Sequence, residues 1–172
     1  MVDRFHRRKG RQVFRLTVEP TPDDIDENGH VNNVVYLRWA QDLGVAHWQS
    51  LAPPAEQAVW AWVALRHEID YRRALLPGET GFGRTWVSDT AEGPRFVRFI
   101  RIDAADGAQG LSMCAQVVTT WVLIEQATGK PKRVPPWMLE MFAWGAEPRQ
   151  WAASALATAS SWRAPASTLG RE

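Results

Sequence analysis

The sequence has a single cysteine, Cys114, among its 172 residues. One cysteine cannot form an intramolecular disulfide, and it excludes the paired-cysteine motifs of metal and redox sites. This scarcity is typical of a reducing compartment, so we expect a cytoplasmic protein. Long apolar runs are lacking too. The longest, residues 59–65, is far too short to cross a bilayer, and no apolar segment behind the charged N-terminus predicts a secretory signal.

A strong charge of either sign is also lacking. Twenty Lys and Arg residues stand against 19 Asp and Glu, which leaves a net charge of +1, too balanced to indicate nucleic acid as the main partner. The local basic run at residues 4–11 is interpreted as a solvated terminal arm. With 45% hydrophobic and 23% charged residues, the composition predicts a soluble globular protein with one sizeable core.

One long helix is predicted early in the chain. Residues 12–19 are β-rich and end at Pro20, and from residue 33 to about 51 the apolar period becomes helical. Asn32 or Asn33 is the expected N-cap. The mostly polar stripe of this helix comprises Arg38, Asp42, Val45 and Gln49, and the opposite face comprises Tyr36, Ala40, Leu43, His47 and Leu51.

Four β-like runs follow, at residues 59–76, 79–90, 95–104 and 111–126, with glycine and proline turns between them. Without crossover helices, these strands should be antiparallel. In the third run, Arg98 shares a face with Phe96, Ile100 and Ile102. A short helix from residue 136 to about 144 and an Ala/Ser-rich final helix complete the prediction. We therefore expect an α+β domain over residues 1–145 and a helical extension and tail over 146–172.

The motif with most chemical content lies just before the long helix, at residues 24–36 (DIDENGHVNNVVY). Asp26, Asn28 and His30 follow each other at every second position. A carboxylate, an amide and an imidazole so close together can polarise a water molecule or attack a carbonyl carbon. Such residues also serve as turn formers and helix caps, which is our interpretation of Asp24 and Asn32. For the other three, chemistry and capping both stay open.

A calcium loop is the main alternative reading of this motif. Asp24, Asp26, Asn28 and Gly29 match the start of an EF-hand loop. The twelfth position, however, should be a bidentate Glu and is Val35, and no helix is predicted to enter the loop. We therefore expect no calcium site, and no other metal or cofactor.

The pattern Asp24-x-Asp26-x-x-Gly29-His30-Val31-Asn32-Asn33-x-x-Tyr36 resembles the signature of hotdog-fold thioesterases of the hydroxybenzoyl-CoA and acyl-CoA type. It is also similar to that of the plant acyl-ACP thioesterases. Residues 69–79 and 128–135 resemble later segments of the same family. The resemblance implies one long helix wrapped by a curved antiparallel sheet of about five strands. It also implies a homodimer with sites at the subunit junction, often paired into tetramers.

The resemblance further implies hydrolysis of an acyl or aryl thioester of coenzyme A or acyl carrier protein. Asp26 corresponds to the acid that acts as nucleophile or general base in the hydroxybenzoyl-CoA branch. The Asp26-x-Asn28-x-His30 spacing is similar to the acid, amide and imidazole set of the acyl-ACP branch. The predicted catalytic residues are Asp26, Asn28 and His30, and the predicted substrate-binding residues are Asn33, Tyr36, Trp62 and Arg72.

Two other functions stay open. Hotdog hydratases and dehydratases resemble Asp-x-Asn-Pro-x-His, whereas this chain is one residue shorter there and lacks the proline. The third class is a non-catalytic acyl-CoA-binding protein. Oxyanion donors are expected from the backbone at residues 33–35 or 60–63. We interpret His47 and His67 as packed or surface residues and Glu68 as a possible second carboxylate. Most of the ten tryptophans are expected in the core or a dimer interface, with Trp60 or Trp62 lining an acyl pocket.

Overall fold

The computed structural model describes residues 13–107 and 110–144. The predicted final helix and the extension 146–172 lie outside the described residues. The elements, in chain order, are β1 (Phe14–Val18), the 3₁₀ turn η1 (Pro22–Asp24), α1 (Asn33–Leu51), α2 (Pro54–Val59), β2 (Trp60–Tyr71), β3 (Gly81–Glu92), β4 (Arg95–Ala105), β5 (Leu111–Glu125), β6 (Lys130–Pro131) and α3 (Pro136–Trp144).

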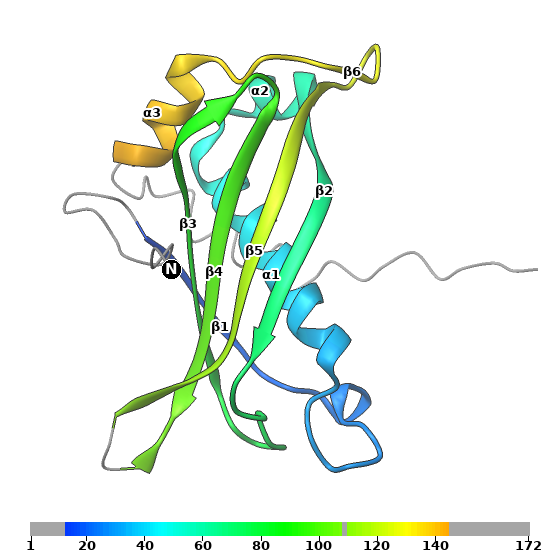
Figure 1. Cartoon of the computed structure of the whole chain (residues 1–172), viewed down its shortest axis with the longest axis vertical. Helices are drawn as coiled ribbons and strands as arrows, with labels where there is room; N and C mark the ends of the chain where they lie inside the picture. The colour runs from blue at the N-terminus through cyan, green and yellow to red at the C-terminus, as the bar shows by residue number, and fades with distance from the viewer. Residues whose placement is uncertain (1–12, 108–109, 145–172) are drawn as a thin grey trace, which may run out of the picture.

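The strands form one sheet in the order β1-β3-β4-β5-β2, and every neighbouring pair is antiparallel. The short strand β6 pairs with the end of β5. In Figure 1 the long strands lie across α1, and α3 lies at the same end of the sheet as α2. This arrangement confirms the predicted α+β architecture, with one long helix against a curved antiparallel sheet.

Local chemistry sets the bounds of α1. The side chain of Asn32 accepts a hydrogen bond from Val34 N at 3.0 Å, so Asn32 is the N-cap. Pro53 follows the C-cap, where a proline stops a helix. The predicted faces are confirmed: the stripe with Arg38 is exposed, and the opposite face with Leu43 is buried. Leu43 fits because it packs on Gly83 of β3, where an added Cβ would lie 2.6 Å from Leu43 Cδ1.

The predicted strand at 59–76 starts within one residue of β2 but ends too late, and the helix before it was not predicted. Pro54 occupies the first turn of a helix, where its missing N–H costs nothing, so residues 54–59 form α2 instead. At the other end, pairing with β5 stops at Tyr71, and residues 72–80 form a loop. The apolar Leu75 and Leu76 extended the predicted strand past the end of β2.

Strand β2 lies at one edge of the sheet and pairs only with β5. Most of its residues are exposed, including Val63 (49%) and Leu65 (57%). An edge strand this long presents a row of free N–H and C=O groups, which natural proteins usually cover. Among the described residues, no helix is long and apolar enough to span a membrane.

Candidate active site

The motif before α1 folds into a closed turn. Ile25 and Val31 form an isolated antiparallel bridge, and Asp26 N donates to His30 O at 2.8 Å. Gly29 N donates to Asp26 O at 3.0 Å, and Gly29 has a φ of 77°, which a residue with a side chain rarely adopts. The glycine of the motif is therefore what allows the chain to reverse here.

The carboxylate of Asp26 is held by this turn. Its Oδ1 accepts hydrogen bonds from Asn28 N at 2.9 Å and from His30 N at 3.3 Å. Its Oδ2 has no hydrogen-bond partner among the described residues, and the side chain is half-buried. The turn thus fixes one carboxylate oxygen through backbone N–H groups and leaves the other without a partner among the described residues.

The side chains of Asn28 and His30 are exposed, and within the described part of the chain neither forms a hydrogen bond. Both residues lie in the same turn as Asp26, and they contact its carboxylate through their backbone N–H groups rather than their side chains. A direct contact of the amide or imidazole with the carboxylate stays a prediction.

Asp24 has a structural role, as its sequence position predicted. It is 2% exposed, and its Oδ2 accepts from Thr21 N at 2.9 Å while Oδ1 accepts from Arg38 Nη2 at 2.8 Å. Burial raises the pKa of Asp24, but the bonds from Thr21 and Arg38 outweigh burial and the pKa is lowered overall. The two aspartates of the motif therefore have different partners: Asp24 joins the loop to α1, and Asp26 caps the turn.

Most of the N–H groups at the start of α1 are already bonded. Asn32 accepts from Val34 N through its side chain and from Val35 N, at 3.0 Å, through its carbonyl. Of residues 33–35, only Asn33 has an N–H with no acceptor among the described residues. Of the oxyanion donors expected at residues 33–35, only the N–H of Asn33 therefore remains without an acceptor in the described structure.

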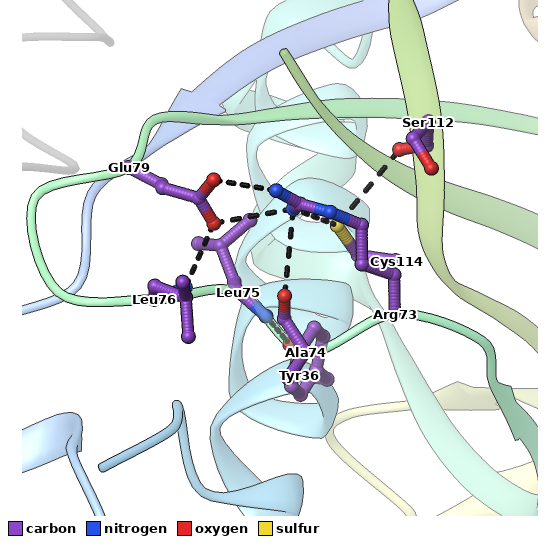
Figure 2. A network of polar contacts seen from close by, with 8 residues as sticks. All are labelled: Tyr36, Arg73, Ala74, Leu75, Leu76, Glu79, Ser112 and Cys114. Carbon is purple, nitrogen blue, oxygen red and sulfur yellow. Dashed lines mark hydrogen bonds and ion pairs between the residues drawn. The ribbon is translucent and has the colours of Figure 1, made fainter. Parts of the chain in front are cut away.

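The loop after β2 is braced by an ion pair, shown in Figure 2. Arg73 donates to both carboxylate oxygens of Glu79, at 2.5 and 3.1 Å, and Glu79 Oε2 also accepts from Leu76 N at 2.8 Å. Arg73 lowers the pKa of Glu79 through these bonds. Arg73 also points toward the Sγ of buried Cys114 at 3.8 Å, and burial raises the pKa of that thiol. The positive charge of Arg73 is therefore paired with Glu79 inside the fold.

This loop in turn supports the motif. The hydroxyl of Tyr36 accepts a hydrogen bond from Leu75 N at 2.8 Å (Figure 2). Leu75 O accepts from Val31 N at 3.0 Å. The hydroxyl of Tyr71 donates to Asn33 O at 3.0 Å. The start of α1, the end of β2 and the turn of Asp26 are thus joined at one end of the molecule. Tyr36, predicted to contact substrate, is 2% exposed and anchors this junction.

The other predicted substrate-binding residues are spread over the fold. Asn33 is exposed at the first position of α1, and Arg72 is exposed just after β2. Trp62 lies near the start of β2 and lines a pocket with Gly44 and Gln49 of α1. From Asn33 to these helix positions is 11 to 16 residues, or about 16–24 Å along the axis. Trp62 is therefore at the opposite end of α1 from Asp26.

The other candidates take ordinary structural roles. His67 Nδ1 lies 2.9 Å from Thr119 Oγ1, and burial lowers the pKa of His67. Glu68 lies 3.4 Å from Arg66 Nε, with both side chains exposed. Within the described residues, no group of three or more His, Cys, Asp or Glu side chains is placed to hold a metal ion.

Sequence reasoning missed one interaction, between His47 and Arg98. Arg98 is 3% exposed, and its Nη1 lies 3.0 Å from His47 Nδ1 and 3.1 Å from Thr85 Oγ1. Burial lowers the pKa of Arg98 to about 9, so it is a cation at neutral pH. Burial and the charge of Arg98 together hold the pKa of His47 well below its ordinary value. The alternation in β4 put Arg98 on the buried face, but no local signal indicated its partner.

Comparison with known proteins identifies the family. A family model described as the thioesterase-like superfamily matches residues 20–142. A thioesterase of Thermus thermophilus, solved with coenzyme A and zinc, is 25% identical with a TM-score of 0.64, and the match covers 78% of this chain and 94% of that one. A search of curated proteins finds no match.

More distant structures support the same fold. A 1,4-dihydroxy-2-naphthoyl-CoA thioesterase from Synechocystis is 19% identical, with a TM-score of 0.61 and coverage of 76% and 96%. A mutant 4-hydroxybenzoyl-CoA thioesterase in complex with 4-hydroxybenzoyl-CoA is 11% identical, with a TM-score of 0.67 and coverage of 76% and 99%. The predicted hotdog fold is confirmed, and because the family model matches more than half of its length, the chain belongs to the thioesterase-like superfamily.

Proposed function

We propose that this protein hydrolyses an acyl or aryl thioester of coenzyme A to a free acid and a thiol, with Asp26 as the reacting carboxylate. The observation that carries this proposal is the geometry of Asp26. Two backbone N–H groups fix Oδ1, and Oδ2 is open. A capping residue needs only the first of these features, whereas a nucleophile or general base needs the second as well.

The chemistry follows two possible routes. As a nucleophile, Oδ2 attacks the thioester carbonyl carbon, the C–S bond breaks, and the thiolate departs. Water then hydrolyses the acyl-aspartyl anhydride that remains. As a general base, Oδ2 takes a proton from water while the water oxygen attacks the same carbon; the C–S bond then breaks, and the departing thiolate takes the proton back from Asp26. Both routes develop negative charge on the carbonyl oxygen. The N–H of Asn33 is a candidate donor to that oxyanion, and one such donor is typically worth about 3–4 kcal/mol of barrier.

Asn28 and His30 are assigned supporting roles. Both side chains are exposed in the same turn and have no partner among the described residues, so both are available to a substrate or a water molecule. An imidazole there can orient or deprotonate water, and an amide can hold it.

The active unit is proposed to be a homodimer formed through β2. Its free edge and its exposed Val63 and Leu65 support this pairing. A twofold axis near the middle of β2 makes the two strands antiparallel, so the Trp60 end of one lies beside the Tyr71 end of the other. Since Tyr71 is bonded to Asn33, each pocket at Trp62 would then lie next to the motif turn of the second copy. This pairing joins two features that one chain holds far apart.

The test is release of thiol from a panel of acyl-CoA and acyl carrier protein thioesters, read with a thiol-reactive dye. Asp26→Asn keeps an oxygen that can accept from Asn28 N and His30 N, so the turn should persist while the reactive carboxylate is lost. We expect turnover to fall by about 10²–10⁴-fold. Glu27→Gln is the matched control, because Glu27 is the neighbouring exposed acid and should change turnover little.

The same panel separates the alternatives. Hydration of an enoyl-CoA without thiol release would indicate a hydratase, and binding without turnover would indicate a binding protein. Faster turnover of the carrier-protein thioesters would mean that the substrate is carried by acyl carrier protein rather than by coenzyme A. Asp26→Asn with near-normal turnover would remove Asp26 from the mechanism.

A further inference from the structure

The pocket at the start of β2 has a wall rich in tryptophan. It lies between the C-terminal half of α1 and the sheet and measures about 270 Å³, near the lower end of the ~300–1,000 Å³ range of small-molecule sites. Four indole rings line it, from Trp48, Trp60, Trp62 and Trp121, together with the ring of Phe96. Such a surface suits the apolar body of a ligand.

A buried cation lies in the same wall. Arg98 lines the pocket although it is only 3% exposed. Its guanidinium carbon lies 5.9 Å from the ring centre of Phe96 and 5.5 Å from that of Phe142. Gly44 of α1 faces it, and a Cβ there would lie 3.5 Å from Arg98 Nε, an ordinary van der Waals distance. The side chain therefore passes beside α1 at a point where the helix has no side chain of its own.

No carboxylate of the described residues neutralises this cation. Arg98 forms no salt bridge with them, and its two hydrogen-bond partners, His47 and Thr85, are neutral. The residues that line the pocket include no Asp or Glu. Buried charges are usually paired, since leaving water is costly for a lone ion.

Hydrogen-bond donors are also in excess around the pocket. The indole N–H groups of Trp62 and Trp121 are buried, and neither has a partner among the described residues. Neither N–H is exposed to the pocket itself, so it is the apolar wall and the one unneutralised cation that make the pocket complementary to an apolar group that ends in an anion.

We propose that this pocket receives the acyl group of the thioester and that Arg98 selects acyl groups whose far end is a carboxylate. The preferred substrates are thus mono-thioesters of dicarboxylic acids, with an aromatic or aliphatic body between the two carbonyl groups. This inference rests on the proposed function and on the antiparallel pairing of β2, which brings the pocket of one copy beside Asp26 of the other. Arg98 contacts the bound acyl group and acts as a specificity residue, not in the chemical step.

The first test needs no variant. The wild-type protein is given two matched pairs of CoA thioesters, 4-carboxybenzoyl with its methyl ester and adipoyl with its methyl ester. Each pair differs in one negative charge at the far end. We expect kcat/KM to favour the free acid by about tenfold or more in at least one pair, as a charge-assisted hydrogen bond typically gives. The two pairs distinguish an aromatic from an aliphatic body. Equal kcat/KM values within both pairs would overturn the proposal.

The second test asks whether Arg98 is the source of the preference. Arg98→Met keeps an apolar chain of similar length, and Arg98→Lys keeps the charge. We expect Met to abolish the preference for the free acid and Lys to restore part of it. Circular dichroism establishes whether each variant folds. Should Arg98→Met fail to fold, the partial Lys effect and the wild-type pairs still decide the question. An unchanged preference in both variants would contradict the proposal.

A binding measurement separates this inference from the proposed function. Quenching of tryptophan fluorescence in Asp26→Asn by the non-hydrolysed thioester pairs reports on the pocket without turnover. If Asp26→Asn binds the free acids more tightly than the methyl esters but the wild type hydrolyses no thioester, the pocket assignment is retained and the proposed function is refuted. Thioester hydrolysis with charge-blind binding would do the reverse.

Discussion

His47 should make the folding stability of this protein depend on pH. The imidazole is 1% exposed and lies 3.0 Å from a guanidinium that can only donate, so Nδ1 must be an unprotonated acceptor. A second proton would place a cation against Arg98 in a buried site, and the pKa of His47 is accordingly held well below 6.5. In the unfolded chain the imidazole titrates normally, with a pKa of about 6.5.

The sign and size of the effect follow from linkage. As pH falls through about 6.5, His47 binds a proton in the unfolded state but not in the folded state. The free energy of unfolding therefore decreases by up to ~1.4 kcal/mol per pH unit. Between pH 7.5 and 5.0 the integrated loss reaches about 2 kcal/mol for a buried imidazole that stays neutral throughout the interval. Asp24 and Glu79 act at more acidic pH, because their partners lower their pKa values and the stability they add is lost only as pH falls through those lowered values.

The assay is guanidinium unfolding at pH 7.5 and 5.0 at one protein concentration. His47→Gln is the control variant, since its amide oxygen can accept from Arg98 but cannot titrate. We expect wild type to lose about 2 kcal/mol more than His47→Gln over this interval. His67, whose pKa is also lowered, titrates in both proteins and cancels in the difference. Equal losses in the two proteins would refute the reasoning.

Two further predictions concern packing and assembly. Gly83→Ala should destabilise the fold by about 1–3 kcal/mol, measured by thermal or chemical unfolding, because its Cβ would lie 2.6 Å from Leu43 Cδ1 and 3.0 Å from Leu16 O; unchanged stability would disprove that contact. Leu65→Glu should shift sedimentation from dimer to monomer, because it places carboxylates near the proposed twofold axis, whereas the control Leu111→Glu, similarly exposed on β5, should not. A Leu65→Glu dimer of wild-type strength would argue against pairing through β2.

Local signals predicted the long helix well. Asn32 as N-cap and Pro53 after the end set the limits of α1 where the pattern placed them. The same kind of signal misled at the end of the run 59–76, because an apolar pattern does not reveal where a strand passes into a loop. Pro54 was the available indication of α2, since proline favours the first turn of a helix.

The residues of the motif were predictable, but their arrangement was not. The sequence identified Asp26, Asn28 and His30 by type and spacing. That the carboxylate accepts from the backbone N–H groups of the other two depends on the turn at Gly29, whose form emerges only in three dimensions. The contact between His47 and Arg98 joins residues 51 positions apart, so periodicity could place each on a buried face but could not pair them.

The most direct test of Asp26 is the rate of the chemical step in a single turnover. Enzyme in excess over a thioester that wild type hydrolyses is mixed rapidly and quenched, and acid formation is followed, so that product release does not limit the signal. We predict that Asp26→Asn slows this step by at least about 100-fold while Glu27→Gln leaves it within about twofold of wild type. An Asp26→Asn variant that forms acid at the wild-type rate would contradict the account.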